Sequence, residues 1–235
     1  LEFRRVLFRS ENSEIYAEDI SFFYKKNYFV LEDINWKIEK GQCWGILGHN
    51  GAGKTTLSYL VLGLLKPSKG VVHNYIKKVE YLPEMGGFYE RLTVRENILF
   101  KLELSGEKQK SKKLKQVLKE FGLIDYEFKR VDKLSQGLKK RVALAMLFLR
   151  ESEAYYFDEP TNALDPEMKK KLRQLIIHLK EAGKIILINS HDLAFVEEIC
   201  TNFLILNNGK VCFNEPNIGV NLEEIYLEKV GERHE

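Results

Sequence analysis

The sequence predicts an α/β fold with a mostly parallel sheet, an N-terminal antiparallel β part and an inserted α-helical subdomain. The continuously apolar run at residues 43–47 and the stretch at residues 185–189 are typical of strands buried on both faces. A third stretch, residues 154–159, is an apolar strand that ends in two acids, and Pro160 stops it. Helical stretches separate these strands along the chain, and such alternation favours a parallel sheet.

The N-terminal antiparallel part is predicted from residues 15–23 and 31–38, which read as half-buried strands. The inserted helical subdomain is expected at about residues 90–150, between core segments 11–89 and 151–235. Residues 11–235 are therefore expected to form a single domain.

The first ten residues, LEFRRVLFRS, are unlike the rest of the chain. Back-translated, they resemble the end of a sequencing adapter, so we expect a non-native scar; the alternative is a natural basic arm that contacts membrane or nucleic acid. Without their three Arg and one Glu, the formal net charge falls from +3 to +1. A nearly neutral chain gives no argument for a nucleic-acid partner.

No stretch approaches the ~18 to 20 consecutive apolar residues of a membrane span. Cys43, Cys200 and Cys212 are far apart in the sequence and form no CxxC pair, so neither a disulfide framework nor a zinc site is indicated. These observations favour a reducing cytosol. The lysine-rich stretch 108–119 predicts a solvated helix face, with a lipid-facing surface as the alternative.

A glycine-rich loop follows the first buried strand and satisfies the pattern GxxxxGK[ST]. A predicted helix at residues 55–65 comes next, which is the context of a P-loop NTPase core. In such loops, backbone N–H groups approach phosphate oxygens, the Lys54 ammonium contacts the β and γ phosphates, and the Thr55 hydroxyl binds Mg²⁺. The predicted nucleotide-binding residues of this segment are Gly48, His49, Asn50, Gly51, Ala52, Gly53, Lys54, Thr55 and Thr56.

The P-loop alone indicates only a nucleotide, since kinases, GTPases and ATPases all share it. Two acids at the end of the predicted 154–159 strand add catalytic capacity. Asp158 lies where a parallel strand presents its carboxyl end to ligands, and we expect it to hold Mg²⁺ through water. Glu159 is then the predicted general base for the attacking water. The alternative is that both acids only cap a strand at the surface.

The sequence Leu134-Ser135-Gln136-Gly137-Leu138 resembles the LSGGQ signature of the ABC ATPases. Gln136 and Leu138 depart from that pattern. Ser135 suits a helix N-cap, and Gly137 lets a phosphate approach the backbone at the start of the helix. The resemblance implies a head-to-tail dimer in which Ser135 and Gly137 contact the nucleotide held by the partner.

Further positions match the family across nearly all of residues 15–230. Tyr24, expected in the loop before Leu31, matches the aromatic that stacks on adenine, with Phe23 or Tyr28 as alternatives. Asp165 matches the D-loop residue that contacts the partner, although it also suits the N-cap of a helix with Pro166 at its first position. His191 matches the switch histidine near the γ-phosphate, and the implied catalytic residues are Glu159, His191 and Lys54.

Glu84 stands where most family members have Gln, and the resemblance places it near Mg²⁺. The metal residues implied are therefore Thr55, Asp158 and Glu84. The sequence around Glu84, residues 82–97, and the segment 222–226 resemble exporter-type cassettes. A groove near Met85, Phe88 and Tyr89 is the expected docking site of a membrane permease.

The resemblance implies an ATPase that converts ATP and water to ADP and phosphate, with Mg²⁺ as cofactor, and that powers a transporter, in particular an exporter. Its expected partners are a second copy of the ATPase subunit and a transmembrane permease. It would then be cytoplasmic and peripheral on the inner face of the membrane. The alternatives are a soluble ABC ATPase without a transport role and a slow nucleotide-dependent regulator.

Overall fold

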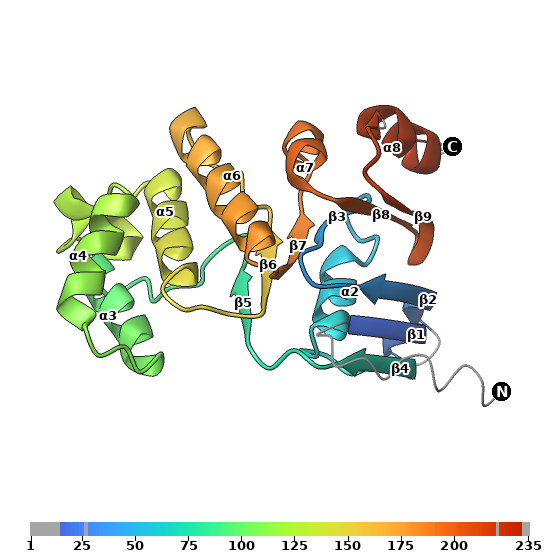
Figure 1. Cartoon of the computed structure of the whole chain (residues 1–235), viewed down its shortest axis with the longest axis horizontal. Coiled ribbons are helices and arrows are strands. Elements are labelled where there is room, and N and C mark those ends of the chain that lie inside the picture. The colour runs from blue at the N-terminus through green and yellow to red at the C-terminus, as the bar shows by residue number, and fades with distance from the viewer. Residues whose placement is uncertain (1–14, 26–27, 220, 232–235) are drawn as a thin grey trace.

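The computed structural model of the chain describes residues 15–25, 28–219 and 221–231. The segment 1–10, for which a non-native origin is predicted, lies outside the described residues. Figure 1 shows two sheets, with a group of helices at one end of the molecule and the three-stranded sheet at the other.

The smaller sheet is antiparallel, with strand order β2-β1-β4. Its strands are β1 (Ile15–Lys25), β2 (Tyr28–Ile38) and β4 (Lys69–Asn74). Irregular register between β1 and β2 leaves runs of buried side chains in β1 instead of strict alternation. Tyr24 lies inside β1, so its expected place in a loop is wrong.

The larger sheet has the order β5-β6-β7-β3-β8-β9. Its strands are β3 (Cys43–Leu47), β5 (Val79–Leu82), β6 (Ala154–Asp158), β7 (Ile185–Asn189), β8 (Asn202–Asn207) and β9 (Lys210–Pro216). All neighbouring strands are parallel except β8 and β9. Every residue of β3, β6 and β7 is buried, which confirms the three predicted core strands.

Helix α2 (Lys54–Val61) packs between the two sheets through Leu57, Leu60 and Val61. It ends earlier than the predicted helix at 55–65, because Leu62 is its C-cap and Gly63 takes a left-handed φ of 76°. The N–H groups of Leu64 and Leu65 both bond to the Tyr59 carbonyl and close this turn. The predicted carboxyl-terminal bound was therefore wrong.

The helical region between β5 and β6 consists of α3 (Val94–Leu104), α4 (Lys110–Glu120), two 3₁₀ turns (Ile124–Tyr126 and Val131–Lys133) and α5 (Gln136–Leu147). A capping box joins Thr93 and Glu96 at the start of α3. In α4, Leu114, Val117 and Leu118 are buried while most of its lysines face outward, as a solvated amphipathic helix requires.

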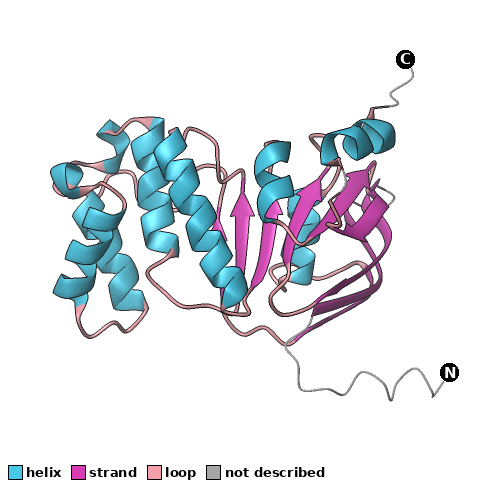
Figure 2. Ribbon diagram, turned by 45° about the horizontal axis from the view of Figure 1, so that its top comes forward, coloured by secondary structure: helices cyan, strands magenta, loops and turns pink. Residues whose placement is uncertain are grey.

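Three helices, α6 (Pro166–Glu181), α7 (Leu193–Ile199) and α8 (Leu222–Val230), lie along one side of the larger sheet (Figure 2). As predicted, Asp165 caps α6 and Pro166 opens it. At the end of α7, Cys200 lies with its Sγ 3.6 Å from that of Cys43, although 157 positions separate them in the sequence; both thiols are free. Within the described ranges, no helix is long and apolar enough to cross a membrane.

Candidate active site

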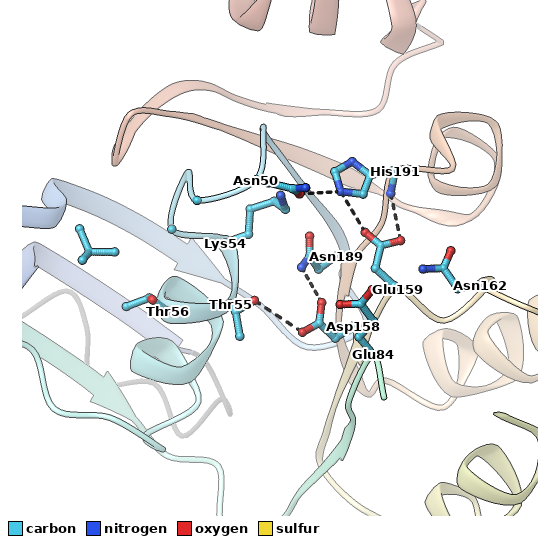
Figure 3. Close-up of a pocket in the computed structure, with 13 residues that line it drawn as sticks. Asn50, Lys54, Thr55, Thr56, Glu84, Asp158, Glu159, Asn162, Asn189 and His191 are labelled. Carbon is cyan, nitrogen blue, oxygen red and sulfur yellow. Dashed lines mark hydrogen bonds and ion pairs between the residues drawn. The ribbon is translucent and has the colours of Figure 1, made fainter. Parts of the chain in front are cut away.

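A pocket of about 500 Å³ opens at the carboxyl ends of β3, β6 and β7 (Figure 3). Most of the predicted site residues line it, although they come from distant parts of the sequence. Its lining comprises Val30, Asn50, Gly51, Gly53, Lys54, Thr55, Thr56, Glu84, Asp158, Glu159, Asn162, Asn189 and His191. The topology brings them together because the ends of neighbouring parallel strands meet at one sheet edge.

The glycine-rich loop takes a shape that glycine alone permits at several positions. Gly48, Gly51 and Gly53 have φ values of 145°, 82° and 101°. A Cβ at Gly48 would lie 2.4 Å from the Leu206 carbonyl oxygen, so the loop packs closely against β8 there. At Gly51, no atom lies within 4 Å of such a Cβ, so the loop faces open space. This cradle fits a phosphate group held by backbone N–H donors.

Lys54 begins α2 and is only 7% exposed. Its Nζ donates to the carbonyl oxygens of Gly48 (2.7 Å) and His49 (3.1 Å), which holds the side chain over its own loop. Burial lowers the pKa of Lys54, and the nearby carboxylates of Glu159 and Asp158 oppose that shift. A cation held here beside a loop of N–H donors suits a polyphosphate ligand.

Asp158 ends β6 beside the P-loop. Its carboxylate accepts from Asn189 Nδ2 (2.6 Å) and, weakly, from Thr55 Oγ1 (3.5 Å). Burial raises the pKa of Asp158, and the bond from Asn189 opposes the shift. The buried Asn189 Oδ1 has no hydrogen-bond partner among the described residues. One hydroxyl, one carboxylate and a free amide oxygen are the hard oxygen donors that Mg²⁺ prefers.

The described residues contain no group of three or more His, Cys, Asp or Glu that could hold a metal ion. The set formed by Thr55 and Asp158 still fits Mg²⁺, because this ion commonly binds one or two protein ligands and completes its shell with substrate phosphates and water. Glu84, the third predicted metal residue, lines the same pocket from the loop after β5.

Glu159 has a strained backbone, with φ at 44°, and donates its N–H to the Asn189 carbonyl (2.8 Å). Its Oε2 accepts from the His191 N–H (3.3 Å), and its Oε1 lies 3.4 Å from His191 Nε2. Burial raises the pKa of Glu159, and the hydrogen bond from the His191 backbone opposes that shift. A carboxylate with a raised pKa that faces a pocket is suited to accept a proton.

His191 lies between the P-loop and Glu159. Its Nε2 lies 3.2 Å from Asn50 Oδ1 in the P-loop as well as beside the Glu159 carboxylate. Glu159, His191 and the P-loop, which carries the third predicted catalytic residue, Lys54, therefore form one continuous set of contacts.

Tyr24 lies next to the P-loop but does not line the pocket. It is 67% exposed, its hydroxyl is 3.4 Å from Thr56 Oγ1, and its ring packs edge-on against Phe22. Of the two alternatives, Phe23 packs edge-on against Phe29, and Tyr28 is 80% exposed at the start of β2. The position of Tyr24 is compatible with the predicted adenine contact, which stays a prediction.

Ser135, Gly137 and Asp165, here called the signature surface, do not line the pocket. Ser135 caps α5 and accepts from the Leu138 N–H (3.3 Å), so α5 begins at Gln136. A Cβ at Gly137 would lie 2.9 Å from the Ala163 carbonyl oxygen. The structure thus separates these three predicted nucleotide contacts from the P-loop of the same chain.

Asp165 is held by two local interactions. It accepts from the Met168 N–H (2.8 Å) and forms an ion pair with Arg141 of α5. These hydrogen bonds lower the pKa of Asp165. Its geometry is accounted for within the chain, so its predicted contact with a partner stays a prediction.

A sequence profile described as "ABC transporter" matches residues 31–162, more than half of the chain. The chain belongs to the ABC transporter ATP-binding family. It therefore has the α/β P-loop fold of the ABC ATPases, and its nucleotide is the ATP or ADP of that family.

Curated relatives support this assignment. The uncharacterized ABC transporter ATP-binding protein YhaQ of Bacillus subtilis is 36% identical over 78% of this chain and 65% of its own length. A putative ABC transporter ATP-binding protein of Listeria monocytogenes is 35% identical over 92% of this chain and 87% of its own. The chain thus spans just under two thirds of the first relative and most of the second.

Two solved structures share the fold. An ATP-binding subunit of an ABC transporter superposes with a TM-score of 0.82 at 29% identity, covering 91% of this chain and 98% of its own. The dimeric ATP-binding cassette MJ0796, bound to ADP and phosphate, gives a TM-score of 0.77 at 23% identity, covering 88% of this chain and 100% of its own.

Sequence reasoning missed Asn189, which bonds Asp158 and supplies a carbonyl to Glu159. A polar residue at the end of an otherwise apolar strand was the available signal. It also missed Lys140, which is buried near both Asp158 and Glu84. Nothing in the spacing of the α5 sequence distinguishes this lysine from its neighbours.

Gln136 and Leu138, the two departures from the family signature, lie in the first turn of α5. Leu138 is half-buried against the core, whereas Gln136 is exposed at the start of α5. Gln136 also lines a second hollow of about 360 Å³ beside the Glu84 loop, together with Met85 and Phe88. Tyr89 lies outside this lining and packs edge-on against Phe100.

Proposed function

We propose that this cassette hydrolyses ATP to ADP and phosphate and thereby powers a transporter through a separate membrane permease. The observation that carries the proposal is the pocket in which Lys54, Asp158, Glu159 and His191 meet at the end of the parallel sheet. A phosphate cradle, a cation, a metal-binding acid and a base with a raised pKa are the parts that phosphoryl transfer to water requires.

Each side chain has a role that its contacts support. The P-loop N–H groups and Lys54 bind the β and γ phosphates, and Thr55, Asp158 and Glu84 hold Mg²⁺. When bound, Mg²⁺ neutralises negative charge on the phosphates. Glu159 accepts the proton of the attacking water at its carboxylate, and His191 orients that carboxylate while it faces the γ-phosphate. Tyr24 stacks on adenine.

The signature surface completes the site from a second copy of the chain. Ser135, Gly137 and Asp165 lie outside the pocket of their own chain, at the amino-terminal ends of α5 and α6. A helix amino terminus stabilises a phosphate that lies close to its free N–H groups. MJ0796, whose fold this chain shares, is a dimer bound to ADP and phosphate, and we extend a dimeric arrangement to this chain.

The Glu159→Gln variant tests the hydrolytic role. It removes the base but keeps the size of the side chain, so ATP binding persists while turnover falls by about 100-fold or more. Light scattering with ATP should show a trapped dimer. Glu153→Gln, at the opposite end of β6 and outside the pocket, is the matched control. Normal turnover in Glu159→Gln would assign the base to another group, with Glu84 the first candidate.

The second hollow is the proposed docking site for the permease, which would hold the cassette on the inner face of the membrane. Met85 at its rim is 76% exposed, and Phe88 is half-buried within it. An exposed apolar group beside the pocket would let permease movement reach Glu84. We assign the exporter branch on the resemblance of residues 82–97 and 222–226 to exporter cassettes.

Co-purification with the permease tests the docking site. Phe88→Asp places a charge in the hollow and should reduce the recovered complex about tenfold or more, whereas Phe88→Leu should retain it. Thermal unfolding of both variants confirms that the fold is kept. Undiminished association of a folded Phe88→Asp protein would exclude Phe88 as an anchor.

A further inference from the structure

Lys140 is a buried cation that the proposed reaction does not use. It lies in the second turn of α5 and is 6% exposed, although a lysine in a surface helix usually extends into water. Its side chain instead points from the helical region to the edge of the larger sheet where the pocket opens.

The ammonium of Lys140 joins two separate segments of the core. Its Nζ lies 3.1 Å from the Glu84 carbonyl oxygen and 3.4 Å from that of Pro83, both in the loop after β5. It also lies 3.5 Å from the carbonyl oxygen of Asp158 at the end of β6. An ammonium has three N–H donors, so one side chain can serve all three carbonyls.

The surroundings of Lys140 are strongly negative. Burial lowers the pKa of Lys140 to about 8, although the negative charges of Asp158, Glu84 and Glu159 oppose that shift. Lys54 is the other buried lysine beside Asp158 and Glu159, and it is already bonded to its own loop. Three carboxylates thus converge on a pocket that must also accept a polyphosphate, and Lys140 offsets part of their repulsion.

Packing alone gives a weaker account of this residue. Burying an ammonium costs free energy unless it is paired, so a residue needed only to fill space would be less costly as methionine. Lys139, its neighbour in α5, shows the ordinary alternative, since it is partly exposed and lies 3.7 Å from Glu90 at the surface.

We propose that Lys140 is a positioning residue that fastens the Glu84 loop to the end of β6 and balances the charge of the Glu84 carboxylate. The inference rests on the proposed nucleotide site for its functional consequence, but the fastening itself is independent of it. The positive charge of Lys140 thereby offsets the repulsion between the Glu84 carboxylate and the γ-phosphate of a bound nucleotide.

Hydrogen exchange of the nucleotide-free chain tests the fastening. In Lys140→Met, the amides of residues 84–89 should exchange at least about tenfold faster, while those of β7 keep their protection. Lys139→Met, which removes the same charge one position away, should leave residues 84–89 unchanged. Unchanged exchange in Lys140→Met would overturn the fastening. Should Lys140→Met fail to fold, Lys140→Gln replaces it; because Gln is shorter and keeps only an amide donor, the amides of residues 84–89 should still exchange faster, but by a smaller factor.

Equilibrium titration with a fluorescent ATP analogue, with and without Mg²⁺, tests the charge balance. Lys140→Met should weaken binding about tenfold, and most strongly without Mg²⁺, because the phosphates then carry their full charge. Adding Glu84→Gln should restore affinity to within about threefold of the original chain, since the unbalanced carboxylate is gone. Equal losses with Glu84 and with Gln at position 84 would overturn the charge balance.

The two measurements separate this inference from the proposed function. If the original chain bound no nucleotide while Lys140→Met still released the loop, the proposed function would fail and the fastening would stand. If the original chain bound nucleotide but hydrogen exchange did not change in Lys140→Met, the fastening would fail and the proposed function would stand.

Discussion

The pocket and the signature surface use their polar groups in opposite ways. In the pocket, Lys54, Asp158 and Glu159 are buried. Asp158 and Glu159 bond to segments from other parts of the chain, and Lys54 bonds to its own loop. On the signature surface, Ser135 and Asp165 are exposed and cap their own helices. The fold of one chain therefore brings the pocket residues together. The residues of the signature surface lie outside that pocket, so they can contact only a ligand that approaches from outside the chain.

Backbone strain follows the same division. Glu159 holds a left-handed φ of 44°, which costs about 1 to 3 kcal/mol and persists only where surrounding contacts enforce it. Ser135 and Asp165 have ordinary extended backbones, with φ at −65° and −71°. Glu159 is therefore strained and the two capping residues are not, although Ala163, whose carbonyl faces Gly137, also has a left-handed φ of 62°.

The largest expected effect separates these two regions at Ser135. Asp and Asn both cap helices well, so Ser135→Asp and Ser135→Asn should both fold. Only Asp adds negative charge where a partner's γ-phosphate is expected, so Ser135→Asp should lower turnover about 100-fold or more, while binding to its own pocket changes less than about threefold. Steady-state turnover and nucleotide titration check this. Equal turnover in the two variants would place the signature surface outside the reaction.

Mixing two inactive chains sharpens the same comparison. Lys54→Ala removes the pocket of one chain, and Ser135→Asp removes the signature surface of the other. In a head-to-tail dimer, an equal mixture contains one intact composite site in half of its dimers, so about a quarter of the original turnover should return. A mixture as inactive as its components would indicate that each chain uses both regions alone.

A smaller effect is expected in stability when each region gains a methyl group. In Gly48→Ala, the new Cβ would meet the Leu206 carbonyl at 2.4 Å in a left-handed backbone, so stability should fall by about 3 kcal/mol. In Gly137→Ala, the contact with the Ala163 carbonyl is 2.9 Å, and the higher helix propensity of Ala returns up to about 1 kcal/mol. The loss of stability should therefore be smaller in Gly137→Ala than in Gly48→Ala. Urea unfolding measures the free energy of unfolding of both variants, and equal losses would contradict the difference between the pocket and the signature surface.

The elements predicted best from the sequence are those with local causes. The strands at 43–47 and 185–189 are confirmed at their predicted bounds, and the strand predicted at 154–159 ends one residue earlier, at Asp158. Short apolar runs of this length are typical of strands buried on both faces of a sheet. The start of α6 followed from Asp165 and Pro166. Helix ends were less predictable, since the end of α2 depends on how Gly63 turns.

Some neighbours had no signal in the sequence. Cys43 and Cys200 read as distant residues, yet their sulfur atoms are 3.6 Å apart because β3 and the end of α7 pack together. Asn189 and Lys140 acquire their contacts with Asp158 only through the order of the strands and the packing of α5.

The sequence by itself determined the P-loop, the two acids at the end of β6 and the family. The P-loop and the acids are short stretches whose residue types follow from the chemistry of phosphate binding, and the family follows from such stretches and their order along the chain. Only the tertiary structure decided which side chains share the pocket, that the signature surface lies outside it, and that the Lys140 ammonium bonds to the Glu84 carbonyl. The reason is physical: spacing along the chain fixes local geometry, whereas burial and charge pairing between distant segments arise only when the chain is packed.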